Sequence, residues 1–355
     1  MTFKGKAVPT TPVKNDLSVV DLVDNYFNAY NAARLSEICR LLVQKIIKND
    51  VTIGMSLTGA LTPAGLGSTT LVPLIENGFV DYIISTGANL YHDIHFALGY
   101  KLHKCNPFLD DQELQREKLV RIYDILMDED VLNHTNNYIR DIIYQKDFQK
   151  KMPSSELHYL LGKYLCKTEE ESGKSSIAML SAAYKHGVPI YTPSPCDSAI
   201  GLDIAEKKFN GIKTDFDVMR DVNEVTAIAY MAKRTGKSGV FILGGGSPKN
   251  FILQTIPQLN DLLNEQVDGH DYFIQITDAR PDTGGLSGAT PSEAVSWGKV
   301  KPDMLPHSVV AYTDVTIALP IIVSYVLSKC TPRKSKRLYD CREKMLDDLA
   351  KDLRK

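Results

Sequence analysis

The sequence predicts an α/β protein with a doubly wound, mostly parallel sheet and added helices. Six short apolar stretches with the character of buried strands alternate with helical patterns, which favours parallel strands joined by crossover helices. Polar or glycine-rich loops follow most of these strands. The 355 residues, 43% hydrophobic and 24% charged, have the composition of an ordinary globular protein with one large core or two modest ones.

Composition and charge argue against several other classes of protein. The net charge of −2 gives no support for nucleic-acid binding. No apolar run reaches the ~18 residues of a membrane span, and residues 1–16 lack the apolar core of a secretory signal. The six cysteines show no C-x-x-C spacing and no metal-type pairing with the eight histidines. We therefore expect a reducing cytoplasm and no structural metal.

The first third of the chain begins with a polar stretch, residues 1–16, for which we expect a flexible arm. Apolar residues near a spacing of 3.6 then predict a helix over 17–50. The elements expected after it are a strand at Val51–Leu57, a helix at Leu71–Asn77, a strand at Val80–Thr86 and a helical stretch that carries His92 and Asp93.

The middle of the chain, residues 110–167, is charged and helical without a clear strand pattern, and we expect a helical insertion that packs on the main sheet. The alternation then resumes. Helices are predicted at 175–186, 215–235 and 251–263, and strands at 188–193, 239–243, 271–277 and 308–314. The tail predicts an amphipathic helix at 338–353, with Leu338, Cys341, Met345, Leu349 and Leu353 on one side.

The polar loops of the predicted sheet lie at the same ends of its strands. The sequences T-G-A-N, P-C-D-S, G-G-G and T-D all follow strands. In Rossmann-like sheets, ligands bind beyond the carboxyl ends of the strands. The sequence therefore predicts a single site at this edge.

The stretch Pro291–Val300 contains a candidate nucleophile. Thr290 and Glu293 have capping-box spacing, so a short helix should begin at Pro291 and end near Gly298. Lys299 would then lie on a fixed turn near Trp297, the only tryptophan. A lysine must be neutral to form an imine, and desolvation lowers its pKa in that direction. The alternative is an ordinary lysine at a helix end.

The triple glycine Gly244–Gly246 permits close approach of the backbone to a ligand, as pyrophosphate binding requires. It does not match G-x-G-x-x-G, so a packing turn is an equal explanation. Aspartates at strand ends, such as Asp197 and Asp314, are commonly helix caps.

Three motifs together are similar to the deoxyhypusine synthase family: G-V-F-I-L-G-G-G-S-P-K-N (239–250), G-G-L-S-G-A-T (284–290) and E-A-V-S-W-G-K (293–299). The resemblance runs from about residue 51 to residue 327. It implies that residues 17–330 form an NAD-binding catalytic domain, followed by the tail 331–355. It also implies that Lys299 is the covalent catalytic residue, with Glu293 in the active site. The cofactor residues that it implies are Thr86, Gly87, Ala88, Asp197, Gly244, Gly245, Gly246, Thr313 and Asp314, and the substrate residues are Trp297 and Ser287.

Several positions depart from the family pattern. Asn250 stands where the family has a base-like histidine. Leu202 and Leu286 replace two aspartates that hold the ends of the polyamine donor, although Asp203 and Asp282 lie nearby and one of them could substitute. His92 replaces a glutamate, and Gly59-Ala60 replaces a Ser-Asn pair. The donor clamp is rewritten, while the cofactor and lysine positions are largely retained.

The resemblance implies an NAD-dependent transferase that moves a 4-aminobutyl group from a polyamine through an imine on Lys299. The rewritten clamp leads us to expect a small amine acceptor such as putrescine, which would give homospermidine. The alternatives are a true deoxyhypusine synthase, which transfers from spermidine to a protein lysine, and a non-catalytic NAD-binding regulator. The family also implies a homotetramer with active sites at dimer interfaces, and no metal.

Overall fold

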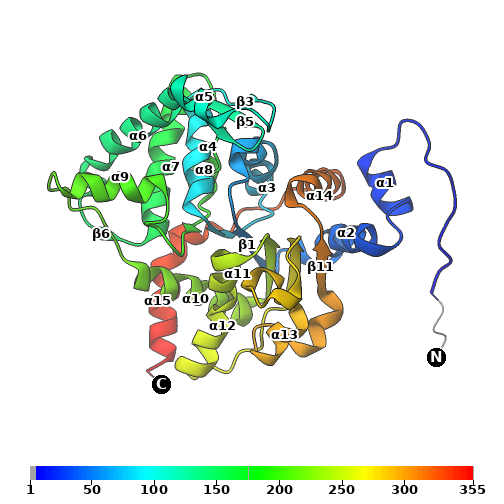
Figure 1. Ribbon diagram of the computed structural model, residues 1–355. Coiled ribbons are helices and arrows are strands. Elements are labelled where there is room, and N and C mark those ends of the chain that lie inside the picture. The colour runs from blue at the N-terminus through cyan, green and yellow to red at the C-terminus, as the bar shows by residue number, and fades with distance from the viewer. Residues whose placement is uncertain (1–4, 175, 355) are drawn as a thin grey trace.

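The computed structural model describes residues 5–174 and 176–354. A β-sheet forms its centre (Figure 1). It has six strands in the order β11-β10-β9-β1-β2-β7, and every neighbouring pair is parallel. The strands are β1 (Val51–Leu57), β2 (Tyr82–Ser85), β7 (Ile190–Tyr191), β9 (Lys237–Leu243), β10 (Tyr272–Thr277) and β11 (Ser308–Tyr312). They coincide with the six predicted strands, and the predicted fold class is confirmed.

The chain winds outward from the middle of this sheet in two directions. Strands β1, β2 and β7 follow one another toward one edge, and β9, β10 and β11 follow one another toward the other. The direction reverses between β1 and β9, which pair from Val51 and Lys237 to Leu57 and Leu243. In doubly wound sheets, ligands bind in the crevice outside the carboxyl ends of the strands at such a switch point.

Two hydrophobic cores lie on the two faces of the sheet, because successive side chains of a strand point to opposite faces. In β9, Phe241 and Leu243 belong to one core, while Val240 and Ile242 belong to the other. The first core includes residues of α2 (Tyr30–Leu41), α3 (Val72–Glu76), α4 (Gly87–Ala97), α7 (Ser154–Glu171), α8 (Met179–His186) and α14 (Val315–Lys329). The second core includes residues of α10 (Val218–Thr235), α11 (Gly246–Leu253) and α15 (Leu338–Asp352).

The single helix expected over 17–50 is wrong. Ser18 caps a short helix, α1 (Val19–Asn25), and a break precedes α2, where Ala29 is extended and Tyr30 has a φ of 53°. A π-helical turn, Leu42–Ile46, then leads to β1. The break allows both α1 and α2 to pack on α14, where Tyr325 donates a hydrogen bond to Asp24 at 2.9 Å.

The insertion over 110–167 is not purely helical, because strands form where the sequence shows no clear strand pattern. A three-stranded antiparallel sheet forms from β3 (His103–Lys104), β5 (Ile125–Asp128) and β4 (Leu119–Ile122). A two-residue turn joins β4 to β5, with Tyr123 at a φ of 54°. The strands are short and half-buried among charged residues, which conceals their alternation. The helical part of the prediction holds in α5 (Asp111–Arg116), α6 (Glu129–Ile143) and α7, and α6 packs on α4 and α9 (Ala199–Lys208).

Several element boundaries differ from those expected. The helix predicted over 251–263 begins earlier, as α11 at Gly246, and continues as α12 (Thr255–Pro257) and a π-helical turn (Gln258–Leu262). In the tail helix Tyr339, Met345 and Leu349 are buried, whereas Cys341 is exposed, so the predicted stripe is only partly correct. Residues 5–16 form no helix or strand and extend away from the sheet in Figure 1. No helix of the described chain is long and apolar enough to span a membrane.

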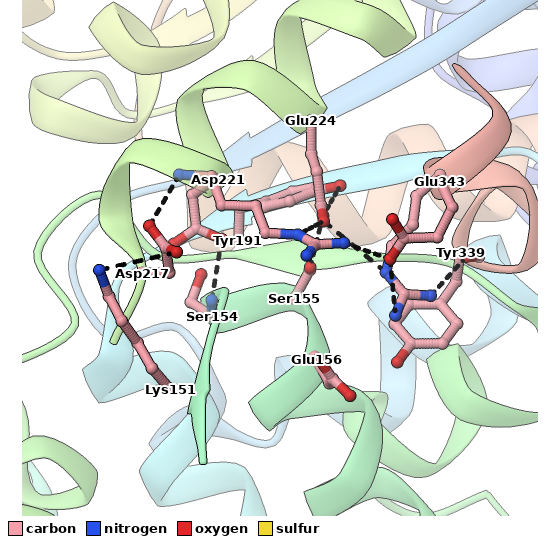
Figure 2. A network of polar contacts seen from close by, with 12 residues as sticks. Lys151, Ser154, Ser155, Glu156, Tyr191, Asp217, Asp221, Glu224, Tyr339 and Glu343 are labelled. Atoms are coloured by element: carbon pink, nitrogen blue, oxygen red, sulfur yellow. Dashed lines mark hydrogen bonds and ion pairs between the residues drawn. The ribbon is translucent and has the colours of Figure 1, made fainter. Parts of the chain in front are cut away.

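A buried carboxylate ties the tail helix to the domain (Figure 2). Glu224 of α10 accepts hydrogen bonds from Ser155 at 2.7 Å, from Tyr191 at 3.1 Å and from Arg220 Nε at 2.9 Å. Arg342 of α15 places a second guanidinium group 3.7 Å from Glu224. These donors offset the cost of burying the charge, and they join α7, β7, α10 and α15.

Candidate active site

The triple-glycine loop follows β9 at the point where the winding direction reverses. Gly244 and Gly246 have φ values of 80° and 54°, a region that glycine adopts without strain. Gly245 has extended backbone, but a Cβ there would lie under 3.0 Å from the backbone of Ser287. The glycine at 245 is therefore required by the close approach of the segment 286–288.

Ser287 joins this segment to the glycine loop. Its Oγ accepts a hydrogen bond from the backbone N–H of Gly246 at 2.9 Å, and Thr58, which follows β1, donates to the carbonyl of Gly245. The packing explanation thus accounts for Gly245. It also gives Ser287, expected as a substrate residue, a structural part in the site.

Lys299 lies at the end of the predicted short helix, α13 (Pro291–Ser296). The hydroxyl of Thr290 caps this helix by accepting from the N–H of Glu293 at 3.2 Å, and Gly298 ends it with a φ of 66°. The N–H of Lys299 donates to Ala294 at 2.9 Å, and its carbonyl accepts from His270 at 2.9 Å. The backbone at Lys299 is therefore held on both sides.

The side chain of Lys299 enters a cavity of about 260 Å³. Its Nζ lies 3.5 Å from Asn250 Oδ1 and 5.4 Å from the centroid of the Trp297 ring. Trp297 is 66% exposed, so the cavity is open on that side. The lining residues are Lys249, Asn250, Leu253, Gln254, Leu286, Ala289, Thr290, Glu293, Ala294, Trp297 and Lys299.

The electrostatics of the cavity favour a reactive lysine. Burial lowers the pKa of Lys299, and the Glu293 carboxylate opposes this change. Only one half of the expected capping box is present, because the Glu293 side chain makes no hydrogen bond or ion pair to any residue that the structure describes. Its carboxylate is therefore available to a cationic ligand.

Two residues of the site were missed in the sequence. Lys249 of α11 is 3% exposed, and its Nζ donates to Gln275 Oε1 at 2.9 Å and to the carbonyl of Ala289 at 2.7 Å. The amide nitrogen of Gln275 donates in turn to the carbonyls of Gly244 and Ser287. The sequence did contain a signal for both. Gln275 is a polar residue within an apolar strand, and Lys249 follows the glycine loop. A polar group buried at such a position needs hydrogen-bond partners.

A second cavity lies at the end of β2 and measures about 70 Å³. The lining residues are Thr86, Gly87, Thr192, Pro193, Ser194, Asp197, Ser247 and Pro248. Helix α4 begins here without a side-chain cap, so its first N–H groups can receive an anion. The buried hydroxyl of Thr192 has no hydrogen-bond partner among the described residues. Ser198 caps α9, so helix capping does not account for Asp197.

Thr313 and Asp314 lie apart from this second cavity. They follow β11 at the edge of the sheet, four strand spacings from β2, or about 19 Å. Asp314 caps α14 by accepting from the N–H of Thr316 at 2.8 Å. One chain therefore does not bring together all the residues expected to bind the cofactor.

The four positions of the expected donor clamp are also dispersed. Leu286 lines the cavity of Lys299 and is 49% exposed, whereas Leu202 on α9 is 67% exposed and does not line it. Asp203 is buried and accepts from Arg140 at 2.7 Å, and Asp282 accepts from Arg280 at 3.0 Å. Replacement of a lost clamp residue by either aspartate, which stays a prediction, would require it to give up its arginine partner.

His92 and Ala88 lie on α4, whose first residue, Gly87, lines the second cavity. His92 Nδ1 lies 3.1 Å from His95 Nε2, and burial lowers the pKa of both imidazoles. Across the part of the chain that the structure describes, no three His, Cys, Asp or Glu side chains gather in a group that could hold a metal ion.

The structure is that of an α/β protein with a lysine-containing cavity beside a smaller cavity at the carboxyl ends of the strands. The family model "Deoxyhypusine synthase" matches residues 21–326. A "Deoxyhypusine synthase-like protein" of Nostoc punctiforme is 56% identical over 349 residues, which cover 98% of this chain and 90% of that protein. A "Probable deoxyhypusine synthase 2" of Methanosarcina mazei is 37% identical over 316 residues, or 88% of each chain.

The fold is shared with a solved structure, that of a "putative deoxyhypusine synthase" from Entamoeba histolytica. The TM-score is 0.61 at 17% identity, over 90% of this chain and 97% of that one. The chain belongs to the deoxyhypusine synthase family. The family is one of transferases that are generally NAD-dependent and oligomeric.

Proposed function

We propose that this protein transfers a 4-aminobutyl group from a polyamine to a small amine, with Lys299 as the covalent residue and NAD as the cofactor. The observation that carries the proposal is the cavity in which Lys299, Glu293 and Trp297 meet. A nucleophile, a carboxylate for an ammonium group and an aromatic ring for cation–π contact are the parts that such a reaction needs. We place the reaction in the cytoplasm.

The second cavity and the glycine loop fit a dinucleotide. The open N-terminus of α4 suits a pyrophosphate, and the carboxylate of Asp197 suits ribose hydroxyls. The unpartnered hydroxyl of Thr192 is a further polar group for a ligand. NAD bound there would accept a hydride from a carbon next to a polyamine nitrogen and later return it. Loss of the hydride would make this carbon open to attack by an amine.

Residues of the chain perform the other parts of the proposed reaction. The neutral amine of Lys299 attacks the activated carbon, and the bond from this carbon to the departing amine breaks. Asn250 Oδ1, 3.5 Å from Nζ, orients the amine by accepting a hydrogen bond from it. Glu293 and the Trp297 ring hold the ammonium end of the four-carbon group.

The charge content of the cavity favours a small acceptor. Glu293 is the only carboxylate among its lining residues, and Leu286 presents an apolar surface instead of a second charge. A long triamine would lose one charge-assisted contact there, worth roughly 1.5–3 kcal/mol. Putrescine has only two amino groups and needs fewer such contacts. It therefore fits this lining better than the triamine spermidine does.

Two chains complete the proposed site. The cavity at β2 is smaller than the roughly 300 Å³ at the lower end for small-molecule sites, and Thr313 and Asp314 lie at the other edge of the sheet. Residues of a second copy would supply the missing wall. We therefore propose a homotetramer with its active sites at dimer interfaces.

The test is product analysis. Pure protein is incubated with NAD and spermidine, with and without putrescine, and the products are identified by mass spectrometry. Homospermidine formation that requires both NAD and putrescine is the expected result. Transfer only to a protein lysine would favour true deoxyhypusine synthesis, and binding of NAD without turnover of any polyamine would favour a regulator.

A further inference from the structure

Lys249 is the second lysine of the cavity, and its contacts use every donor that a lysine has. Its Nζ lies 2.7 Å from the carbonyl oxygen of Ala289, 2.9 Å from Gln275 Oε1 and 3.4 Å from the carbonyl oxygen of Ser287. An ammonium group has three N–H donors and no acceptor. The three oxygens therefore match a charged Lys249, whereas a neutral amine would leave one of them without a proton.

Lys299 has different surroundings. Its Nζ has one polar contact, at 3.5 Å to Asn250, and otherwise faces the Trp297 ring and the open cavity. Loss of a proton therefore costs Lys299 little, since its hydrogen bond to Asn250 is long and the described residues give its Nζ no other. If one of the two lysines gives up a proton, the contacts select Lys299.

We propose that Lys249 is a fixed ammonium ion at the inner end of the cavity, and that its charge holds Lys299 in the neutral, nucleophilic form. A neighbouring cation is one of the known ways to activate a lysine. The inference rests on the proposed function, since only a reacting Lys299 needs to be neutral. Lys249 does not touch the reacting atoms, and it acts as a positioning residue through its charge.

The two lysines are electrostatically coupled, and their hydrogen bonds decide which of them keeps its proton. Among the residues that line the cavity, the charged ones are Lys249 from α11, Glu293 from α13 and Lys299 itself. Burial lowers the pKa of Lys249 to about 8, and the charge of Lys299 contributes to this decrease, whereas burial is what lowers the pKa of Lys299. Repulsion between two cations acts on both groups, so the lysine that keeps its proton lowers the pKa of the other. The three oxygens around Lys249 stabilise its ammonium form and assign the proton to it. Glu293 raises the pKa of both lysines and thus opposes the activation.

The arrangement also places opposite charges at two ends of the cavity. The cation of Lys249 lies at the buried end, and the carboxylate of Glu293 lies on an exposed residue. An amine substrate would be repelled from the first and attracted to the second. Its ammonium end should therefore lie toward Glu293 and Trp297.

The test follows the protonation of Lys299 directly and needs no polyamine reaction. An amine-selective acylating reagent is applied between pH 6 and 10, and labelling of Lys299 is measured by peptide mass spectrometry. Lys249→Met removes the charge at similar length, and we expect the labelling midpoint to rise by about one pH unit, or tenfold slower labelling at pH 7. Lys249→Arg keeps the charge, and its midpoint should remain that of the unaltered protein.

Gln275→Glu provides a second route if Lys249→Met does not fold. This variant keeps Lys249 but places a carboxylate at its 2.9 Å partner, so the midpoint of Lys299 should rise here too. An unchanged midpoint in both variants, each shown to be folded by circular dichroism, would overturn the proposal. A raised midpoint in a protein that transfers no aminobutyl group would support the charge assignment and count against the proposed function.

Discussion

At the scale of single residues, the site depends on the balance between one carboxylate and two lysines. Glu293 projects from the first turn of α13, where its backbone N–H is taken by Thr290 while its side chain remains available to the cavity. This position allows the carboxylate to attract a substrate amine. It also raises the pKa of Lys299 and so makes the nucleophile less reactive at neutral pH.

Glu293→Gln should separate these two effects. Removal of the carboxylate should lower the pKa of Lys299 and move the rising, acidic limb of the pH–rate profile to lower pH, because the neutral amine is the reactive form. It should also weaken amine binding by roughly 1.5–3 kcal/mol, or about 10- to 100-fold in KM. Steady-state kinetics between pH 6 and 10 measure both effects. A rate profile that does not move, in a variant with raised KM, would show that Glu293 does not act on Lys299.

The roles of some single residues could be predicted from the sequence, and those of others could not. The position of Lys299 at a helix end was predictable, because the cap, the proline and Gly298 are local signals. The hydrogen bond of Ser287 to the glycine loop and the burial of Lys249 as a hydrogen-bond donor could not be predicted. Both depend on Gln275, which comes from a strand that only the tertiary fold brings beside them.

At the scale of elements, the triple-glycine turn is defined by close packing as well as by backbone conformation. Gly245 touches the segment 286–288, whereas Gly284 has no heavy atom within 4 Å of a hypothetical Cβ but has a φ of 74°. The two glycines therefore differ in what an added methyl group would meet.

Gly245→Ala and Gly284→Ala form a matched pair. Gly245→Ala should cost roughly 1–3 kcal/mol of unfolding free energy, because the methyl group overlaps the backbone of Ser287. It should also reduce NAD affinity by displacing the turn. Gly284→Ala should cost about 1 kcal/mol from strain alone and leave NAD affinity unchanged. Urea unfolding and NAD titration distinguish the two, and equal NAD affinity in both variants would contradict this account of the turn.

The elements themselves were largely predictable from hydrophobic periodicity. The six strands of the main sheet appear in the sequence as apolar runs, and all but the edge strand β11 are buried over nearly their whole length. The pair β4 and β5 does not appear as an apolar run, because most of its residues are half-buried. The turn between them also lacks a glycine, since Tyr123 adopts the left-handed conformation there. The break between α1 and α2 was equally hidden, since it results from packing of both helices on α14.

At the scale of the whole molecule, the core contains buried carboxyls that respond to pH. Burial raises the pKa of Asp93 to about 8 and that of Asp221 to about 7. Both values exceed the ~3.9 of an unfolded chain, so the folded state binds more protons. Stability from these groups is then greatest below about pH 4 and is lost as the pH rises toward 8.

Asp93→Asn should flatten this dependence. The amide cannot ionise and still offers an oxygen to the N–H of Met179. Unfolding free energies from urea titrations between pH 5 and 9 should fall less steeply than in the unaltered protein, by up to about 1.4 kcal/mol per pH unit. Asp141→Asn, an exposed change on α6, serves as the control and should not alter the slope. Identical slopes in all three proteins would contradict the assignment.

The whole-molecule arrangement explains which part of the site the sequence could not reveal. The carboxyl ends of the strands do meet at one edge, as their loops predicted, and this edge brings the glycine loop to the lysine cavity. The four strand spacings between β2 and β11 keep Thr313 and Asp314 away from Thr86. The motifs indicate which residues belong to the proposed site, but only the strand order shows how far apart one chain places them.

The central claim, that Lys299 becomes covalently attached to the four-carbon group, has one direct measurement. Borohydride is added to the protein during turnover with NAD and spermidine, and tryptic peptides are analysed by mass spectrometry. We expect a stable aminobutyl adduct on Lys299, dependent on both NAD and spermidine, and no adduct in Lys299→Arg. An adduct on Lys249 instead, or transfer that proceeds at full rate in Lys299→Arg, would contradict the account.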